Sequence, residues 1–219
     1  INDVGYLFRN DLVEFRNNFS YHNEKLFLLN IGIKNFDIDF NHVIAKNTDN
    51  VLLMNIFKSV LSINFKNYSF LDITQSFTTD CYDDRAIYDF VEDSLYVAKI
   101  LKIPSSRTFQ IDFGTDPNHK YYFDFSYVKT KTKLGESGYG YLLFFEANIS
   151  ESSDLAIAFI KNEGTDQFKF LDVIPDIIEQ EKNHFVFAKD RSVDKKFTFR
   201  YSKFFNNGIT LQLYHEYFA

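Results

Sequence analysis

Three aspartates cluster around one turn in the middle of the chain and could together hold a cation. Asp112 and Asp124 flank the stretch Gly114-Thr115-Asp116-Pro117-Asn118, and His119 follows it directly. Carboxylate oxygens gathered at a turn are the ligands that Ca²⁺ prefers. Asp112, Asp116 and Asp124 lack the regular alternation of a calcium loop, however, and Asp-Pro-Asn is also ordinary turn chemistry. A calcium site and a plain turn both remain open, and the spacing favours the turn.

Two acids and a lysine further along the chain form a second candidate site. Pro175-Asp176 followed by Asp194-Lys195-Lys196 resembles the pattern of restriction-type nucleases. In such enzymes two carboxylates hold Mg²⁺ and a lysine orients the attacking water. The resemblance implies a Mg-dependent nuclease, with Asp176 and Asp194 as ligands and Lys196 beside the water. That chemistry needs the second acid inside an apolar strand, whereas the residues before Asp194 predict a turn.

An arginine and a histidine near the start of the chain suggest a third site. The stretch from Arg16 to His22 resembles the active-site signature of the HEPN ribonucleases, which place Arg and His on a helix pair and cleave RNA without metal. The resemblance covers this stretch only and would make Arg16 and His22 catalytic. In that family the motif lies late in a helical bundle, but here almost nothing precedes it and predicted strands follow.

No other constellation in the sequence indicates catalysis or a cofactor. The histidines are scattered without a His-x-His or His-x-x-x-His pair, so we expect no zinc site and no bound cofactor. The single cysteine, Cys81, lies beside Asp83 and Asp84, whose charges raise the pKa of a thiol rather than activate it. Phosphate-loop, dinucleotide and Gly-x-Ser-x-Gly motifs are absent from the sequence. Enzymatic activity is therefore left open, with a non-enzymatic role favoured.

The charge of the chain argues against nucleic acid as a partner. The formal net charge is -6, and an acidic chain lacks the basic field that nonspecific nucleic-acid binding requires. One local exception is the set Lys129, Lys131 and Lys133, whose spacing of two places all three on one face of a strand. A solvated strand face is the simpler interpretation, and a phosphate site is the alternative.

The first half of the chain reads as a mixed α/β segment, residues 1–105. Apolar residues recurring every three or four positions predict helices over 3–17, 51–63 and 83–102, the last ending before Pro104. Strand-like stretches at 26–33 and 36–40 lie between the first two helices. The stretch 104–106 is where the pattern changes, although one continuous domain also fits.

The second half, residues 106–219, has the period of two that half-buried strands show. It predicts eight antiparallel strands, arranged as a sandwich, a jelly roll or a barrel. Asn207-Gly208 predicts a two-residue hairpin turn with positive φ at both residues. That turn would place Phe197, Phe199 and Tyr201 on one inner face with Leu213 and His215. The predicted strands are 107–113, 120–130, 139–148, 155–161, 167–174, 184–189, 196–202 and 209–217.

These features favour a non-enzymatic binding or assembly subunit that acts through protein–protein contacts, such as a virion, phage or secretion-apparatus component or an inhibitor-like partner. The surplus of aromatic residues, 27 Phe and 14 Tyr, supports a protein partner or self-assembly into an oligomer. A nuclease and a carbohydrate-binding β-sandwich remain as alternatives. The residue bias indicates an AT-rich genome, and the first residue, Ile1, suggests an upstream segment that was removed. We expect a cytoplasmic or virion location, with secretion still open, and no membrane span because apolar runs are short.

Overall fold

The computed structural model describes residues 11–24, 32–91, 95–175 and 183–219. Within them the chain forms β-strands and loops and no helix. The strands are β1 (Leu12–Asn23), β2 (Ile33–Asn47), β3 (Leu52–Phe65), β4 (Phe70–Thr78), β5 (Cys81–Val91), β6 (Leu95–Ile103), β7 (Ser106–Gly114), β8 (Tyr121–Thr132), β9 (Ser137–Ser150), β10 (Ser153–Pro175), β11 (Asn183–Phe204) and β12 (Thr210–Phe218).

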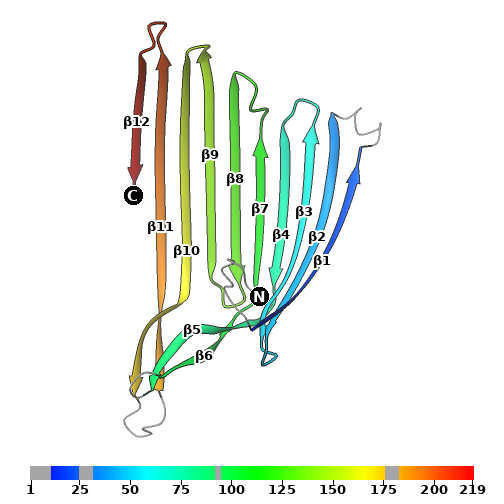
Figure 1. The fold of residues 1–219 in the computed structure, drawn as a ribbon, viewed down its shortest axis with the longest axis vertical. Coiled ribbons are helices and arrows are strands. Elements are labelled where there is room, and N and C mark those ends of the chain that lie inside the picture. Colours follow the sequence, from blue (N-terminus) through cyan, green and yellow to red (C-terminus); the bar gives the residue numbers. More distant parts are fainter. Residues whose placement is uncertain (1–10, 25–31, 92–94, 176–182) are drawn as a thin grey trace, which may run out of the picture.

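One sheet contains ten of these strands, all antiparallel, in the order β1-β2-β3-β4-β7-β8-β9-β10-β11-β12. Every neighbour in this order is also the next strand of the chain except at β4–β7, where β5 and β6 leave the sheet as a separate hairpin. Figure 1 shows the strands side by side, with β12 at one edge, β1 at the other and the β5–β6 hairpin below. The sheet takes strands from both halves of the sequence, because β4 and β7 pair directly.

The hairpin is tied back to the sheet at its base. The Asn47 side-chain amide donates a 2.8 Å hydrogen bond to Asp84, and the backbone N–H of Ser105 donates a 2.7 Å bond to Asp80. The Ser105 N–H, with help from Lys102 and Lys133, holds the pKa of the Asp80 carboxyl below its ordinary value. These contacts fix where the chain leaves β4 and re-enters as β7.

All three predicted helices are corrected where the structure describes them. The 51–63 segment is β3, the 83–102 segment is the β5–β6 hairpin, and the 3–17 segment is β1 from Leu12 onward, its earlier residues lying outside the described part. Val60, Ile56 and Phe57 favour strands, and pairing with β2 and β4 satisfies the backbone of β3 on both sides. Tertiary pairing therefore overrides the helix-like spacing.

The predicted eight strands are six longer ones, and the sandwich, jelly roll and barrel are all corrected. The stretches at 155–161 and 167–174 form one strand, β10, and those at 184–189 and 196–202 form β11. The polar stretch Asn162–Asp166 is no turn, because it pairs residue by residue with β11, from Asp194 to Asp190. The ten-stranded sheet is not closed into a barrel, and in the described residues only the small β5–β6 hairpin accompanies it.

The C-terminal hairpin confirms the predicted shared face but not the two-residue turn. Phe197, Phe199 and Tyr201 lie opposite Tyr217, His215 and Leu213, so these side chains share one face. The turn is a three-residue loop, because Gly208 donates to the Phe205 carbonyl and the Phe205 N–H pairs with Ile209. Within this loop, only Gly208 has a positive φ, at 80°. The shared face is open to solvent rather than buried, with Leu213 50 % exposed.

Replacing Gly208 with valine is expected to lower the free energy of unfolding by about 1–2 kcal/mol, since a β-branched residue resists this φ. Nothing lies within 4 Å of a Cβ placed there, so the loss would be conformational and not steric. Urea titration followed by circular dichroism measures it. An unchanged midpoint would show that the loop opens to another conformation.

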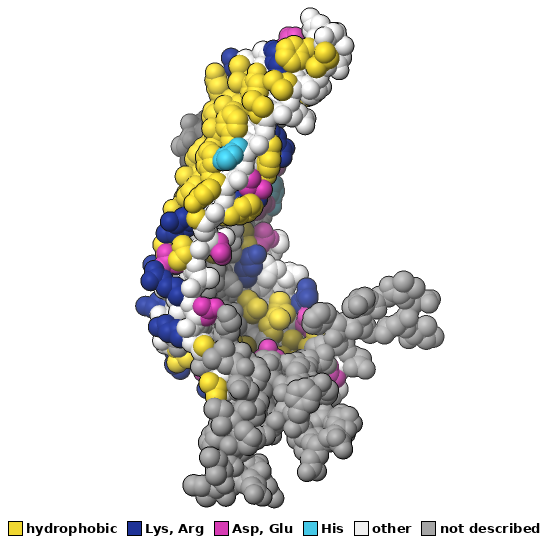
Figure 2. All heavy atoms as spheres, turned by 90° about the vertical axis from the view of Figure 1, so that its left-hand side faces the viewer, with side chains coloured by type: hydrophobic (Ala, Val, Ile, Leu, Met, Phe, Trp, Pro, Cys, Tyr) yellow, Lys and Arg dark blue, Asp and Glu magenta, His cyan; other side chains and the backbone are white. Residues whose placement is uncertain are grey.

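The described residues form almost no hydrophobic core. The buried apolar side chains among the described residues are Ala45, Cys81 and Ala147. The accessible surface is 15629 Å², against about 10500 Å² for a compact monomer of this mass. Figure 2, an edge-on view from the β12 side, shows the sheet as a curved layer with hydrophobic side chains spread over its upper part. In the described residues, the sheet therefore leaves many large apolar side chains exposed to solvent.

No helix in the described residues is long and apolar enough to cross a membrane.

Candidate functional site: an apolar sheet face with a cationic border

The strand register separates the side chains into two faces of opposite character. The face that contains Phe19 is apolar on every strand of the large sheet, and we call it the apolar face. Its main members are Phe15, Phe19 and Tyr21 on β1; Phe36, Ile38, Phe40 and Ile44 on β2; Phe57, Leu61 and Ile63 on β3; Leu71, Ile73 and Phe77 on β4; Phe109, Ile111 and Phe113 on β7; Tyr121, Phe123, Phe125 and Tyr127 on β8; Tyr139, Tyr141, Leu143 and Phe145 on β9; Leu155, Ile157 and Phe159 on β10; Phe197, Phe199 and Tyr201 on β11; and Leu211, Leu213 and Tyr217 on β12.

Much of this apolar face is open to solvent in the isolated chain. Phe19 is 61 % exposed, Phe40 52 % and Tyr121 57 %. Contiguous apolar patches on soluble monomers rarely exceed a few hundred Å², and larger ones mark contact with a protein or a membrane. In the described part of the chain, this exposed apolar face is the main candidate contact surface.

The opposite face, here called the polar face, carries mainly polar and charged side chains on most strands, but on β9 and β10 it carries Leu142, Phe144, Ala158 and Ile160. Asp37, Ser62, Asp72 and Asp112 occupy one row across β2, β3, β4 and β7. Small and polar residues such as Thr130 and Ser126 continue the pattern on β8. The two faces of the sheet therefore differ in character, most clearly on β1–β4, β7 and β8.

The apolar face ends at a border of cations that crosses the strands obliquely. Lys46 on β2, Arg107 on β7 and Lys161 on β10 all belong to this face. His42 and Arg107 lie in one row across the strands, and Lys46 lies four residues past His42 along β2. Ile111 and Lys161 lie in another row, and Arg107 lies four residues past Ile111 along β7, in the same direction. Each step thus covers about 13 Å along the strands and about 14 Å across three strand spacings. The border is therefore inclined to the strands by about 47°.

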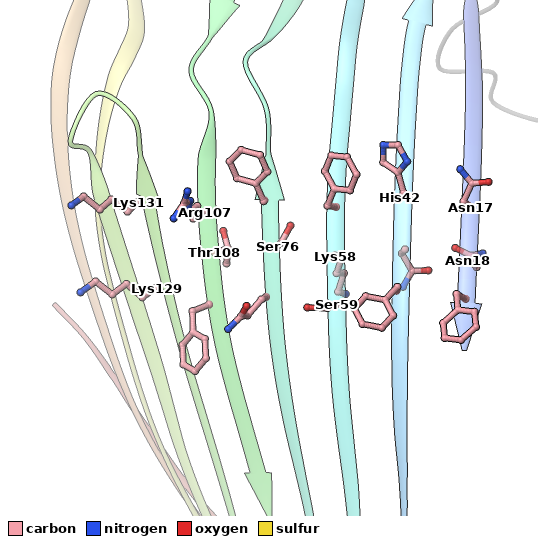
Figure 3. A pocket seen from close by; sticks show the side chains of 17 residues that line it. Asn17, Asn18, His42, Lys58, Ser59, Ser76, Arg107, Thr108, Lys129 and Lys131 are labelled. Atoms are coloured by element: carbon pink, nitrogen blue, oxygen red, sulfur yellow. The ribbon is translucent and has the colours of Figure 1, made fainter. Parts of the chain in front are cut away.

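A hollow of about 910 Å³ extends over the sheet from β1 to β8 and meets this border at β7 and β8. Phe57, Phe77 and Phe109 surround the smaller Ser59 and Gln75, so the surface dips between the rings. Figure 3 shows Arg107, Lys129 and Lys131 side by side at one end of the hollow, with His42 and Asn17 toward the other. The hollow therefore combines an aromatic wall with a cationic rim.

The cations on this rim face one another without an acid between them. Arg107 lies directly opposite Lys131 in the β7–β8 pair, and Lys129 follows on the same face. Among the described residues, no carboxylate lies within ion-pair distance of any of the three, although Arg107 sits 5.6 Å over the Phe77 ring. Like charges directly opposite each other in a sheet repel. The arrangement suits an anion that is supplied from outside.

A different network holds the same border further along, on β9, β10 and β11. Tyr139 and Arg191 donate hydrogen bonds to the carboxylate of Glu163, and Lys161 lies 3.4 Å from it and donates to the Tyr139 oxygen. The Tyr139 hydroxyl, followed by Arg191 and Lys161, lowers the pKa of Glu163 to about 2. This carboxylate is therefore a structural anion that organises its neighbours.

Replacing Glu163 with glutamine is expected to flatten the acid dependence of stability between pH 4.5 and about 2. The folded pKa is below the ordinary value of 4.5, so the contribution of Glu163 is complete above pH 4.5 and is lost as the pH falls through about 2. Urea titrations at a series of pH values measure this. The exposed Glu151, in the β9–β10 turn, provides the matched control, and identical acid profiles for E163Q and wild type would contradict the assignment.

The three aspartates proposed around a calcium site are spread between a turn and two strands. Asp116 is buried in the β7–β8 turn, where its carboxylate accepts hydrogen bonds from the backbone and side-chain amides of Asn118, at 2.9 and 3.0 Å. Asp112 and Asp124 lie on the polar face of β7 and β8. Burial raises the pKa of Asp124. In the described residues no group of three acids, histidines or cysteines is placed to hold a metal.

The residues of the two nuclease resemblances are placed as follows. Arg16 and His22 both lie on the polar face of the edge strand β1, about 20 Å apart along it. Arg16 pairs with Glu14, while His22 contacts Asp37 and Glu24, and the Asp37 hydrogen bond raises the pKa of His22. Asp194 and Lys196 lie within β11, with Lys196 paired to Glu216.

The segment that carries Asp176 lies outside the described residues. The turn predicted before Asp194 is wrong, since that residue pairs with Asn162 inside the sheet.

Cys81 is buried at the start of β5. Burial, with help from Asp80 and Asp83, raises the pKa of its thiol. The predicted increase in the pKa of Cys81 is confirmed. Its largest cause is burial, and the acids that contribute are Asp80 and Asp83, not Asp83 and Asp84.

Sequence reasoning noticed Lys129 and Lys131 but missed Arg107 and the apolar face as a whole. Lys133 does not belong with Lys129 and Lys131, because it follows the end of β8 and its Nζ lies 3.9 Å from an Asp80 carboxylate oxygen. Arg107 joins through cross-strand pairing, which no local pattern reveals. A usable signal was the alternation Phe57, Leu61, Ile63 with Lys58, Ser62, Asn64 inside a segment interpreted as a helix.

No protein-family model matches this chain, and neither curated proteins nor solved structures provided a match. The function of the chain is therefore inferred from its sheet and side chains.

Proposed function

We propose that this chain is a lipid-facing wall of a membrane-embedded assembly, in which the apolar face lies against acyl chains and the polar face lines an aqueous space. The observation that carries the proposal is the continuity of the apolar face over all ten strands of the sheet. Its role is structural, and it replaces the predicted protein partner on this face with lipid.

The alternation along the strands, and the aromatic ends of the apolar stretch on β8, support lipid. From Tyr121 to Tyr127 β8 extends about 20 Å along its own axis, and from Tyr139 to Ala147 β9 extends about 27 Å, which at a tilt of about 43° correspond to about 15 and 20 Å of height. Membrane-crossing strands carry an apolar band about 25 Å tall, flanked by aromatic residues, and alternate apolar and polar side chains along each strand. The described strands have this alternation, with tyrosines at both ends of the band on β8.

The oblique cationic border gives independent support. Membrane-crossing strands are tilted by about 35–45° from the bilayer normal, so a flat lipid boundary cuts each strand at a shifted height. The border from Lys46 through Arg107 to Lys161 is inclined to the strands by about 47°, so a lipid boundary that follows it would tilt the strands by about 43° from the bilayer normal. Figure 2 shows lysine and arginine side chains gathered below the hydrophobic ones along the left edge of the view. A planar slab of lipid fits this border better than a protein partner of arbitrary shape.

A carbohydrate ligand fits the face less well than lipid does. Aromatic side chains do line one face, as a carbohydrate-binding sheet requires, but aliphatic Leu61, Ile111 and Ile157 lie between them. Sugars need hydrogen-bonding groups beside the rings, and the middle of this face offers few. Acyl chains need none.

In this proposal, the assembly expected from the sequence forms through the two edge strands of the sheet. Among the described strands, β1 and β12 each have a neighbour on one side only. Inside lipid an unpaired edge leaves backbone N–H and C=O groups unsatisfied at a cost of several kcal/mol each. Further strands, from this polypeptide or another copy, therefore pair with β1 and β12 in the working assembly.

The expectation of no membrane span was based on the shortness of apolar runs. That criterion applies to helices, which need about 20 consecutive apolar residues. A strand that alternates apolar and polar side chains crosses lipid without any such run. Run length therefore does not weigh against the proposal.

Flotation with phosphatidylcholine vesicles tests the proposal. The purified full chain is expected to float with neutral vesicles, to remain with them in concentrated salt, and to gain strand signal in circular dichroism. A chain that stays in the dense fraction as a monodisperse monomer would overturn the proposal. A water-soluble dimer that ignores vesicles would instead favour protein–protein contact across the apolar face.

A further inference from the structure

We infer that Arg107, Lys129 and Lys131 form a binding site for the phosphate of an anionic phospholipid, whose acyl chain lies along the neighbouring aromatic hollow. The inference rests on the proposed lipid contact and adds a headgroup preference to it. It is carried by a hollow, a cluster of cations on its rim, and the absence of a protein anion to neutralise them among the described residues.

The position of the cluster fits a headgroup. Arg107 and Lys129 are the first cations beyond the apolar band on β7 and β8, and Lys131 lies beside Arg107. A lipid whose tails cover Phe113 and Phe125 would have its phosphate at the height of these cations. Because the border crosses β7 and β8 here, the cations meet the headgroup layer and not the acyl region.

The chemistry of the three side chains also fits a phosphate. The planar guanidinium of Arg107 can donate two parallel hydrogen bonds to phosphate oxygens, and each lysine adds a mobile point charge. Arg107 is directed over Phe77 at 5.6 Å, a contact that orients the guanidinium. An anion between Arg107 and Lys131 would turn a repulsive cross-strand pair into a bridged one.

The apolar part of the hollow fits a chain rather than a second polar group. Phe57, Phe77 and Phe109 stand around Ser59 and Gln75, which are smaller than the rings and leave room beside them. Figure 3 shows Lys58 directed to the other side of β3, so its charge lies away from the rings. An acyl chain can lie between the rings while its phosphate stays at the rim.

Titration calorimetry in zwitterionic detergent micelles tests the site with short-chain lipids. Dihexanoyl phosphatidylglycerol is expected to bind at least about tenfold more tightly than dihexanoyl phosphatidylcholine, since each cation near an anionic lipid contributes about 1 kcal/mol. Inorganic phosphate, which has no acyl chain, should bind far more weakly than phosphatidylglycerol. Equal affinity for phosphate and phosphatidylglycerol would overturn the lipid assignment.

The triple variant R107Q/K129Q/K131Q should lose the preference for phosphatidylglycerol while still floating with phosphatidylcholine vesicles. A matched variant, R16Q/K58Q/R200Q, removes the same charge from the polar face and should keep the preference. A preference that survives in the triple variant, or disappears in both variants, overturns the site. Failure of wild type to float with neutral vesicles would instead reject the proposed function, so the two failures are distinguishable.

Discussion

Replacing Leu143 with arginine should lower the free energy of unfolding in phosphatidylcholine vesicles by about 2–4 kcal/mol, the cost of a charge near the middle of a lipid-facing strand. Leu143 lies in the centre of the apolar face, opposite Phe125 on β8 and Phe159 on β10. It is 39 % exposed in the isolated chain. In water alone an arginine there would therefore cost little, and only lipid makes it expensive.

The neighbouring residue provides the control. Leu142 is also a leucine on β9, but it belongs to the polar face, opposite Ser126 and Ile160. Leu142→Arg should cost less than half as much as Leu143→Arg when urea unfolding of vesicle-bound protein is followed by circular dichroism. Equal losses for the two variants would mean that both faces meet the same environment.

Replacing Gly114 with valine should destabilise the sheet by about 1–3 kcal/mol, as overpacking does. Gly114 lies opposite Phe70 in the β4–β7 pair, where the sheet continues after the chain has left it for the β5–β6 hairpin. A Cβ at Gly114 would overlap the Phe70 ring. The ring must then leave its rotamer or the strands must separate.

A double-mutant cycle checks the cause of that loss. Phe70→Ala removes the ring and has its own cost, but in the presence of Gly114→Val it should also relieve the overlap. The double variant should therefore lose less stability in urea than the sum of the two single variants. Strictly additive losses would show that Phe70 does not pack on Gly114, and hence that β4 and β7 pair in a different register.

The strand patterns of the second half were predictable from sequence because alternation there is regular and the turns carry Gly, Asn and Asp. The shared face of Phe197, Phe199 and Tyr201 with Leu213 and His215 followed from side-chain parity, although the two-residue turn was wrong. The first half was misread because a step of four residues is also a multiple of two. Apolar residues such as Phe57 and Leu61 therefore share a face in a strand as well as in a helix.

The absence of a second layer could not be predicted from local patterns. A strand with one apolar face looks the same whether protein or lipid covers that face. The lengths of β10 and β11 were also hidden, because their polar middle, such as Asn162 paired with Asp194, resembles two turns. The sequence indicated two of the three cations of the site, because Lys129 and Lys131 are two residues apart. Arg107 joins them only through the β7–β8 pairing, which local sequence does not reveal.

Spin labels along β8 test the lipid-facing assignment most directly. In a Cys81→Ser background, single cysteines at Phe123, Asp124, Phe125 and Ser126 would be labelled and the protein bound to phosphatidylcholine vesicles. Labels at Phe123 and Phe125 should be relaxed mainly by oxygen, which concentrates in lipid, and labels at Asp124 and Ser126 mainly by a water-soluble nickel chelate. Labels at Phe123 and Phe125 that are shielded from both reagents, or that respond like their neighbours, would contradict a lipid-facing sheet.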